Sequence, residues 1–254
     1  MPFTVSHAVL APILCRFSAG ALPIAALAIG CMAPDLYRIF TSTQYDQSHQ
    51  WRNIFSFTIW IGFGFCVLWY ALYRPVLYRI FSLEDPLNLY NFKRIFIFIL
   101  SCLVALSIGI STHLIWDGLT HTDFRTFAFH NMLAQPITLF GYTYPLHRLL
   151  QIGSSIIALP FVIWMMARYM RIFYQPLAIS QSARRIGFVL LLLSFLLGMF
   201  SMLDYLRHIP QHYYSSGLYH ITGRAMNEFA QGFMICLSLG SLLFLFLDRG
   251  RRLT

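Results

Sequence analysis

The stretch IFIFILSCLVALSIGISTHLIW, residues 95–116, decides the fold class, because it holds 22 residues without an Asp, Glu, Lys or Arg. About 20 apolar residues in a helix cross the hydrocarbon core of a bilayer. Asp117 follows directly, with His113 four positions before it and His121 four positions after it. Because residues four apart share one face of a helix, the pattern predicts two imidazoles and a carboxylate on one ridge at the mouth of a membrane helix.

The composition of the whole chain agrees with a membrane protein. Of its 254 residues, 58% are hydrophobic and only 11% are charged, and the mean hydropathy is +0.64. The net charge of +9 would suggest nucleic-acid binding in a soluble protein, but here the basic residues flank apolar runs, as orientation in a bilayer requires. We therefore expect the lipid bilayer, and no nucleic acid, as a partner. The five cysteines lie apart in apolar segments, which argues against both a disulfide framework and a cysteine-based zinc site.

The hydropathy pattern predicts an all-α, polytopic membrane bundle with five full spans and an N-terminal short helical hairpin. In the hairpin, residues 8–14 and 22–32 are apolar but each is too short to cross a bilayer, and Arg16, Ser18 and Gly20 separate them. A shallow or re-entrant hairpin would bring its two ends to one side of the membrane. The five predicted spans are residues 54–73, 95–116, 149–170, 186–206 and 229–247.

The basic residues predict the orientation of these spans. Segments 74–94, 168–185 and the C-terminal tail carry 4, 4 and 3 basic residues, whereas the three alternate segments carry 2 each. The positive-inside rule then places the first set, and the C-terminus, in the cytoplasm. All nine histidines fall on the opposite side, so we expect a site that faces outside the cytoplasm.

On that side the sequence offers six candidate ligands for a divalent metal, most plausibly zinc. Zinc prefers three or four nitrogen and oxygen ligands, and a catalytic zinc leaves one position to a water that becomes the nucleophile. Six ligands would suffice for one ion, or for two ions bridged by a carboxylate. Asp46 and Asp123 are candidates for a general base or for orienting the histidines. The candidate metal ligands are His7, Asp35, His49, His113, Asp117 and His121.

Plainer interpretations stand beside this one. His113 and Asp117 would also suit a hydrogen bond to each other that closes the helix end. A single histidine at a membrane edge is commonly an interfacial residue, and we interpret His130, His208, His212 and His220 in this way. 

A second feature precedes the third predicted span. His147 and Arg148 enter that span and would suit a phosphate or an anionic head-group, because the arginine fork binds phosphate with two donors. The alternative is a helix that starts after Pro145 with an interfacial anchor.

Four motifs resemble, in their order, a bacterial membrane family of unknown function. They are MPFTVSH at residues 1–7, GCMAPD at 30–35, HLIWDGLTH at 113–121 and HRLLQIGSS at 147–155. That family is similar to the predicted inner-membrane metal-dependent hydrolases, and more remotely to the zinc-dependent phospholipase C fold. The resemblance covers about residues 1–170 and implies a metal-dependent-hydrolase-like domain there, with two additional spans in 171–254. It implies metal ligation by His7, Asp35, His49, His113 and Asp117, with His121 as a neighbour or ligand.

The chain departs from the phospholipase pattern at one point. Those enzymes carry a second helical His-x-x-x-Glu pair, whereas the only glutamates here are Glu84 and Glu228. The resemblance implies an integral inner-membrane hydrolase of an ester, such as a phosphoester of a lipid or envelope precursor. The alternative is a transporter or assembly factor that uses the same histidines and aspartates for ion or proton handling.

Overall fold

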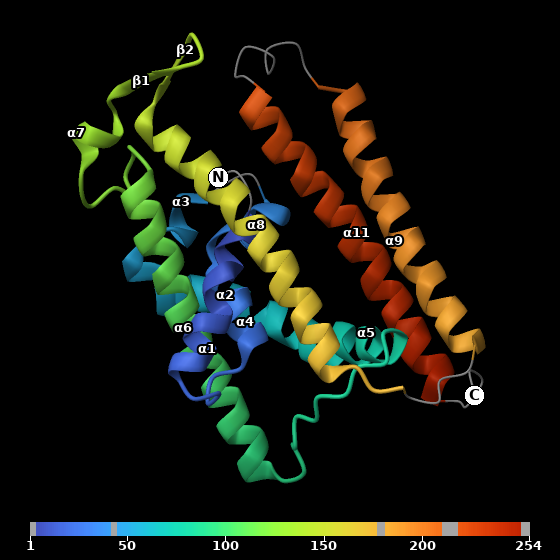
Figure 1. The fold of residues 1–254 in the computed structure, drawn as a ribbon. Helices are drawn as coiled ribbons and strands as arrows, with labels where there is room; N and C mark the ends of the chain where they lie inside the picture. The colour runs from blue at the N-terminus through green and yellow to red at the C-terminus, as the bar shows by residue number, and fades with distance from the viewer. Residues whose placement is uncertain (1–3, 42–44, 177–180, 210–217, 250–254) are drawn as a thin grey trace. The chain divides into compact units, whose positions relative to one another are not determined.

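The computed structural model describes residues 4–41, 45–176, 181–209 and 218–249, and within these ranges helices dominate (Figure 1). Five helices are long and apolar enough to cross a membrane: Trp51–Ile80, Phe92–Thr120, Leu146–Phe173, Gln181–Arg207 and Ile221–Asp248. The predicted all-α class with five spans is therefore confirmed. Each span extends beyond the predicted range because its polar ends continue the helix.

The N-terminal hairpin is also confirmed. It consists of η1 (Thr4–Leu10), which continues into α1 (Ala11–Phe17), and of α2 (Ile24–Leu36). Ala19 and Gly20 both have positive φ, at 51° and 81°, and reverse the chain between the two arms. Glycine adopts this conformation without steric cost, which explains its place at the second of these positions.

The first span is a composite of several helical segments. A short link holds η2 (Tyr37–Ile39) and α3 (Tyr45–Ser48), and the span then runs through η3 (Trp51–Asn53), η4 (Ile54–Thr58), α4 (Ile59–Val67), η5 (Leu68–Tyr73) and α5 (Arg74–Ile80). η4 and η5 are π-helical. The first span was predicted to end at residue 73, but the helix continues, with Pro75 in the first turn of α5. A proline is tolerated in a first turn because its missing N–H would have no helical acceptor there.

The second span, α6 (Phe92–Thr120), is followed by a compact connection. It contains α7 (His130–Leu133) and an antiparallel hairpin of β1 (Pro136–Leu139) and β2 (Tyr142–Pro145), with Ile137 opposite Tyr144. The remaining spans are α8 (Leu146–Phe173), α9 (Gln181–Arg207) and α11 (Leu218–Arg249).

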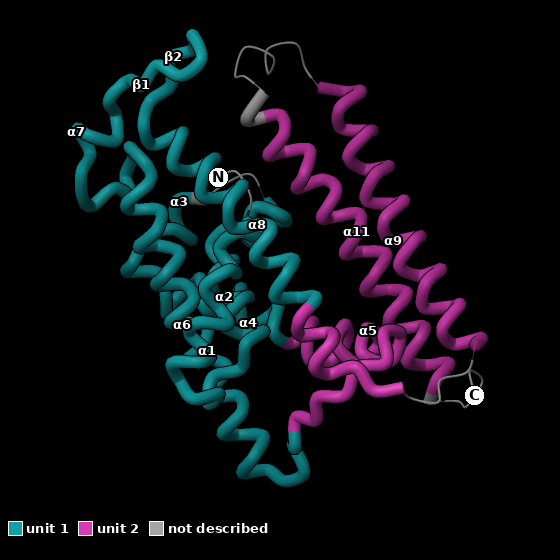
Figure 2. The backbone as a smooth tube through the Cα atoms, in the orientation of Figure 1, with its two compact units in different colours: residues 1–66, 88–167 teal, residues 67–87, 168–254 magenta. Residues whose placement is uncertain are grey.

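The chain forms two compact units (Figure 2). The first comprises residues 1–66 and 88–167, and the second comprises residues 67–87 and 168–254. The sequence predicted a hydrolase-like domain in residues 1–170 and two additional spans in residues 171–254. This domain assignment stays a prediction.

A pair of glycines fixes the closest helix contact of the first unit. Gly30 of α2 faces Gly109 of α6, and a Cβ built on Gly109 would lie 2.6 Å from the Leu27 carbonyl oxygen. Only residues without side chains permit two helix backbones to approach so closely. The hairpin is thereby held against the helix that carries the predicted ridge.

In the second unit, short contacts gather the segments that carry the predicted cytoplasmic basic residues. Arg79 pairs with Asp248 at 2.7 Å, the Arg184 guanidinium donates to the Ser82 hydroxyl at 3.3 Å, and the Glu84 amide donates to the Phe173 carbonyl. The basic segments around residues 79, 184 and 248 therefore share one end of this unit, as the charge pattern requires.

Candidate metal centre

Four separate segments of the first unit bring five of the predicted ligands together. His7 comes from η1, Asp35 from α2, His49 from the turn after α3, and His113 and Asp117 from α6. Their ligand atoms form two groups, His7–Asp35–His113 and His49–His113–Asp117, within each of which all atoms lie within 4.8 Å of one another. The hairpin thus supplies its two ends to the ridge on α6, as its geometry predicts.

His113 is oriented by the hairpin. Its Nδ1 lies 2.7 Å from the carbonyl oxygen of Cys31, which only accepts, so Nδ1 carries the proton. In the neutral ring the lone pair is then on Nε2, which is buried and has no hydrogen-bond partner among the described residues. Metal-binding histidines are typically held by such a second-nitrogen contact. The glycine contact between α2 and α6 is what brings Cys31 within reach.

His49 is oriented in the same way by its neighbour. The Ser48 hydroxyl donates to the Pro34 carbonyl at 2.8 Å, and its oxygen lies 3.0 Å from His49 Nδ1, which is therefore the donor of that second contact. His49 Nε2 lies 3.4 Å from Asp35 Oδ1 and 3.6 Å from Asp117 Oδ2. Burial lowers the pKa of His49, so its ring is neutral at neutral pH.

His7 is the fifth residue of the cluster and contacts His113. Its ring stacks on that of His113, with 4.2 Å between the centroids and an interplanar angle of 27°. His7 is half-buried, whereas Asp35, His49, His113 and Asp117 are at most 5% exposed. His7 is therefore the member of the cluster that reaches the surface.

The distances within the cluster fit a bound cation. The nitrogen–carboxylate distances of 3.4–3.6 Å, including 3.6 Å from His113 Nε2 to Asp117 Oδ2, exceed the usual hydrogen-bond length. Two ligands at tetrahedral positions around zinc, each about 2.0–2.1 Å from it, are about 3.3–3.4 Å apart. Asp117 Oδ1, also buried, has no hydrogen-bond partner among the described residues. A buried carboxylate oxygen and an imidazole lone pair both favour a positive charge between them.

Arg125 is a site residue that the sequence interpretation missed. Its Nη1 donates to Asp117 Oδ2 at 3.1 Å, and its Nη2 and Nε donate to the two carboxylate oxygens of Asp123 at 2.5 and 2.9 Å. The guanidinium thus links the buried carboxylate of the cluster to one nearer the surface. Although partial burial raises the pKa of Asp123, the hydrogen bonds from Arg125 bring it down to about 2.

The loop that carries Arg125 folds back because Gly118 leaves room for it. A Cβ at Gly118 would collide with the ring of Phe127, and the Phe127 amide donates to the Gly118 carbonyl at 3.4 Å. A sequence signal for Arg125 did exist, namely an Asp-x-Arg pair just after the ridge, with a glycine next to Asp117. That signal does not show that the loop returns to the helix.

His121 lies beside the cluster, in neither of the two groups. The prediction of one helical ridge holds for His113 and Asp117 only, because α6 ends at Thr120 and His121 has an extended conformation. Its Nδ1 donates to the Asp117 carbonyl at 3.0 Å and lies 3.7 Å from Asp117 Oδ1. Burial lowers the pKa of His121 to about 4, against the charge of Asp117. Its role as a ligand stays a prediction.

The other predicted residues lie around this centre. Asp46 is exposed on α3, three residues before His49, and Asp123 forms an ion pair with Arg125. His147 Nδ1 donates to the Leu133 carbonyl at 3.2 Å, and Arg148 follows it in the first turn of α8. These contacts tie the start of α8 to α7, and the role of both residues in binding substrate stays a prediction.

The remaining histidines behave as interfacial residues where they are described. His130 is exposed on α7, and His208 is exposed and lies 3.4 Å from Asp204. The side chains of His212 and His220 lie outside the described residues.

Replacing Arg125 by alanine should destabilise the metal-free protein more than the zinc-loaded one. Loss of one partner from a buried ion pair typically costs about 3–5 kcal/mol, because the other charge stays buried, whereas a bound cation would compensate Asp117. Thermal unfolding in detergent, with and without zinc, should therefore show a larger zinc-induced rise in Tm for Arg125→Ala than for the wild type. Arg52→Ala, which removes an exposed arginine, is the matched control. Equal zinc-induced shifts in all three proteins would contradict this role.

Comparison with known proteins gives a family without an assigned activity. No curated protein and no solved structure matches the chain. A family profile whose description is "Domain of unknown function (DUF4184)" matches residues 1–245, which include every residue of the cluster. The chain therefore belongs to the DUF4184 family, whose members share a domain of unknown function.

Proposed function

We propose that the histidine–aspartate cluster binds a divalent cation, most plausibly zinc, and that the protein is a membrane hydrolase of a phosphoester in a lipid or envelope precursor. One observation carries this proposal. His113 Nε2 and Asp117 Oδ1 are buried without a hydrogen-bond partner among the described residues, in a cluster of three imidazoles and two carboxylates from four segments. Leaving such atoms buried and unsatisfied is costly unless a ligand satisfies them.

The residues of the chain would divide the work as follows. His113, Asp117, His49, Asp35 and His7 would hold the cation, while Cys31 and Ser48 keep two of the imidazoles in the required tautomer. The cation, when bound, would polarise the phosphoryl oxygen and make water acidic enough to supply a nucleophile near neutral pH. 

The sequence predicted Asp46 and Asp123 as candidates for a general base. Because Asp123 is engaged by Arg125, the exposed Asp46 is the better candidate of the two aspartates.

The depth of the cluster suits a substrate that lies in the membrane. Asp117 is three residues from the end of α6, which is about 5 Å along a helix that rises 1.5 Å per residue, and His113 is about 10 Å from that end. With 29 residues α6 is about 44 Å long, which matches a bilayer with its head-group regions, so Asp117 would lie at the level of the lipid ester and phosphate groups and His113 just below that level. The charge pattern supports a centre that faces outside the cytoplasm, and the resemblance supports an inner-membrane location. The resemblance to inner-membrane metal-dependent hydrolases supports the reaction class.

Metal analysis joined to an activity assay tests the proposal. The protein purified in detergent should contain a stoichiometric divalent metal and should hydrolyse a long-chain phospholipid, and His113→Ala with Asp117→Ala should remove both properties. His130→Ala with Asp204→Ala, two exposed positions outside the cluster, is the control. Absence of metal from the wild-type protein, even after incubation with zinc, would refute the centre. Metal binding together with ion flux in liposomes, and no hydrolysis, would favour the transport alternative.

A further inference from the structure

A cavity of about 330 Å³ lies against the metal centre in the first unit. Three elements build it: η1, the end of α6, and the middle of α8. Its lining is mostly apolar, from Val9, Leu10, Trp116, Ile157, Ala158 and Phe161. His7 belongs to both structures, because it lines the cavity and is a member of the His7–Asp35–His113 group. 

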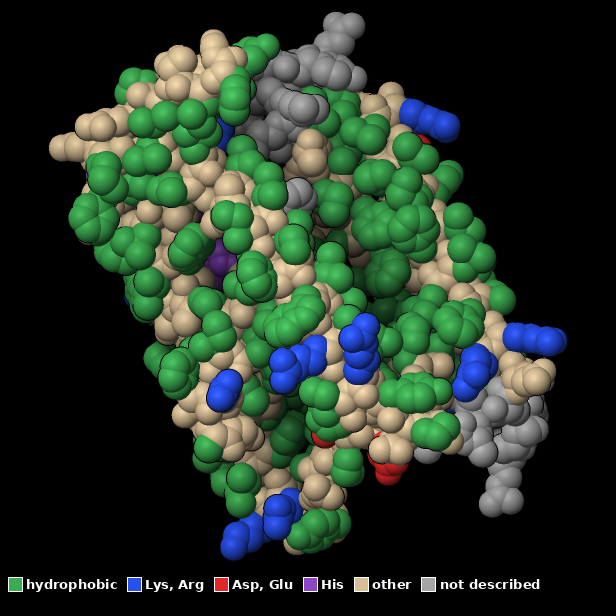
Figure 3. Space-filling view, viewed as in Figure 1, with side chains coloured by type: hydrophobic (Ala, Val, Ile, Leu, Met, Phe, Trp, Pro, Cys, Tyr) green, Lys and Arg blue, Asp and Glu red, His purple; other side chains and the backbone are tan. Residues whose placement is uncertain are grey.

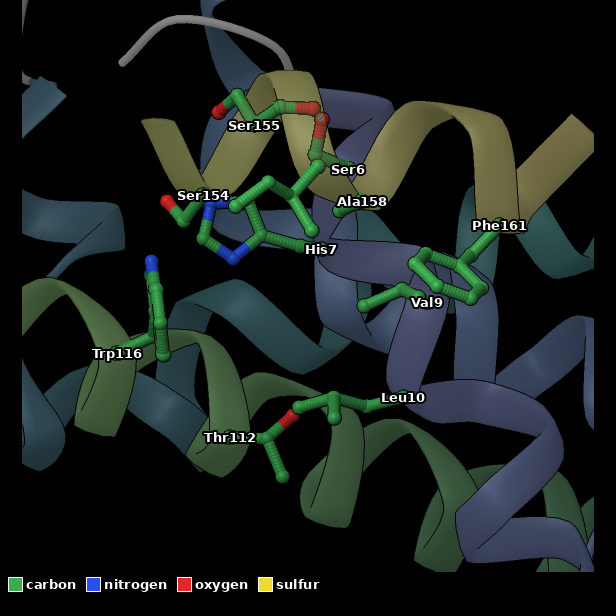
Figure 4. Close-up of a pocket in the computed structure, with 11 residues that line it drawn as sticks. Ser6, His7, Val9, Leu10, Thr112, Trp116, Ser154, Ser155, Ala158 and Phe161 are labelled. Atoms are coloured by element: carbon green, nitrogen blue, oxygen red, sulfur yellow. Dashed lines mark hydrogen bonds between the residues drawn. The ribbon is translucent and has the colours of Figure 1, made fainter. Parts of the chain in front are cut away.

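The polar and apolar parts of the cavity are separated. In the close-up, the His7 ring lies near Ser154 and Trp116 at one end, and Val9 and Phe161 lie at the other end (Figure 4). The Ser6 hydroxyl donates to the Ser155 carbonyl at 3.2 Å, which attaches η1 to α8 beside the polar end. A ligand that fits this lining has one polar group and one apolar tail.

The cavity opens toward lipid. Ile157 is 66% exposed and Phe161 is 55% exposed, and both lie on α8, one of the five apolar spans. Trp116, 40% exposed, stands on α6 in the same lining. Exposed side chains in the middle of a spanning helix contact hydrocarbon chains of the bilayer. The space-filling view shows that hydrophobic side chains cover much of this face of the molecule (Figure 3).

The axis of the cavity follows the direction of a lipid chain. Ser154 is eight residues from the start of α8, about 12 Å along the helix, whereas Phe161 is about 22 Å from that start. Gln151 donates to the Thr120 carbonyl, so the start of α8 and the end of α6 lie at the same level. A chain that runs from His7 toward Phe161 therefore runs from the interface toward the bilayer core. The volume is near the lower limit of ligand pockets and suits one chain segment rather than a whole lipid.

We propose that this cavity holds one hydrocarbon chain of a phosphoester lipid that enters sideways from the bilayer, with its phosphoester at His7. The position of the phosphoester rests on the proposed function, whereas binding of the chain does not. The lipid would reach the centre without leaving the membrane. The proposal thus assigns the substrate class and the route of entry.

Photolabelling tests the chain-binding part without any need for activity. The full-length protein in detergent is mixed with a phosphatidylglycerol that carries a diazirine on one acyl chain, and a fatty acid with the same diazirine is the second probe. With the phospholipid probe, light should label the peptides that contain Leu10 and residue 158 at least about fivefold more in the wild type than in Ala158→Phe, in which the larger side chain fills the cavity. Ala167→Phe, the same substitution at an exposed position of α8, should leave labelling unchanged. 

Two outcomes would overturn the inference. Labelling that is uniform over the apolar helices and insensitive to Ala158→Phe would exclude a chain site. Labelling by the fatty acid but not by the phospholipid would exclude a phosphoester lipid.

A second pair of measurements separates this inference from the metal centre. Ala158→Phe should keep the wild-type metal content and its hydrolysis of a small water-soluble aryl phosphodiester, but lose at least tenfold in hydrolysis of the long-chain phospholipid. If neither protein hydrolyses the soluble ester, the proposed function fails, and the photolabelling result still decides whether the cavity holds a chain. If Ala158→Phe hydrolyses the phospholipid as the wild type does, the cavity is not the route of the substrate.

Discussion

His113→Ala is expected to lower the affinity for zinc by more than about 100-fold, the upper end of what loss of an outer-shell partner costs. His113 is the residue that both candidate groups share. Its Nδ1 is engaged by the Cys31 carbonyl, so the ring offers a single lone pair and ligates a single ion. We therefore expect one divalent ion per chain. Isothermal titration in detergent gives both the affinity and the number of ions.

Alanine variants of the other histidines test which of them bind the ion. His7→Ala and His49→Ala should each weaken binding less than His113→Ala, because each belongs to only one group. His121→Ala tests the residue that lies in neither group, and a loss comparable to that of His113→Ala would make it a ligand. His130→Ala, at an exposed position, should bind as the wild type does. Two ions per chain, with one retained in His113→Ala, would contradict a single centre built on this residue.

The sequence predicts the membrane fold well because hydropathy and helix length are local properties. All five spans are present, and so is the short hairpin at residues 4–36. The first span continues beyond its predicted end at residue 73, because Pro75 disfavours a helix interior but fits a first turn. Whether a helix restarts at that point depends on packing, which the residue itself does not reveal.

The candidate centre was predictable in part, for a different reason. His7 and Asp35 converge on the ridge because a hairpin must return its ends to one side, a consequence of its length alone. The placement of Arg125 depends on the fit of Phe127 against Gly118, a contact that no periodicity encodes. The helix end that removes His121 from the ridge lies at Thr120, where no glycine or proline marks a stop. The geometry of the loop after α6 therefore determines the positions of Arg125 and His121, which the pattern of residue types does not reveal.

The close contact between α2 and α6 predicts a large loss of stability for Gly109→Ala. The added Cβ would lie 2.6 Å from the Leu27 carbonyl oxygen, 2.7 Å from the Cys31 amide nitrogen and 2.8 Å from the Gly30 carbonyl carbon. These are backbone atoms, so no rotamer change relieves the overlap and α2 must move away from α6. We expect a loss of about 2–3 kcal/mol in the free energy of unfolding, as for overpacked cores.

A control from the same class of residue makes this effect specific. At Gly64 in α4 and Gly153 in α8, a built Cβ would meet no other described segment within 4 Å, so alanine there should be neutral or should stabilise, by up to about 1 kcal/mol from helix propensity. The sign of the shift in Tm should therefore differ between Gly109→Ala and the two controls. The substitution should also weaken zinc binding, because the same movement withdraws the Cys31 carbonyl from His113 Nδ1 and frees the ring to turn. A Gly109→Ala protein that unfolds like Gly64→Ala and binds zinc like the wild type would show that the close contact between α2 and α6 does not hold the centre together.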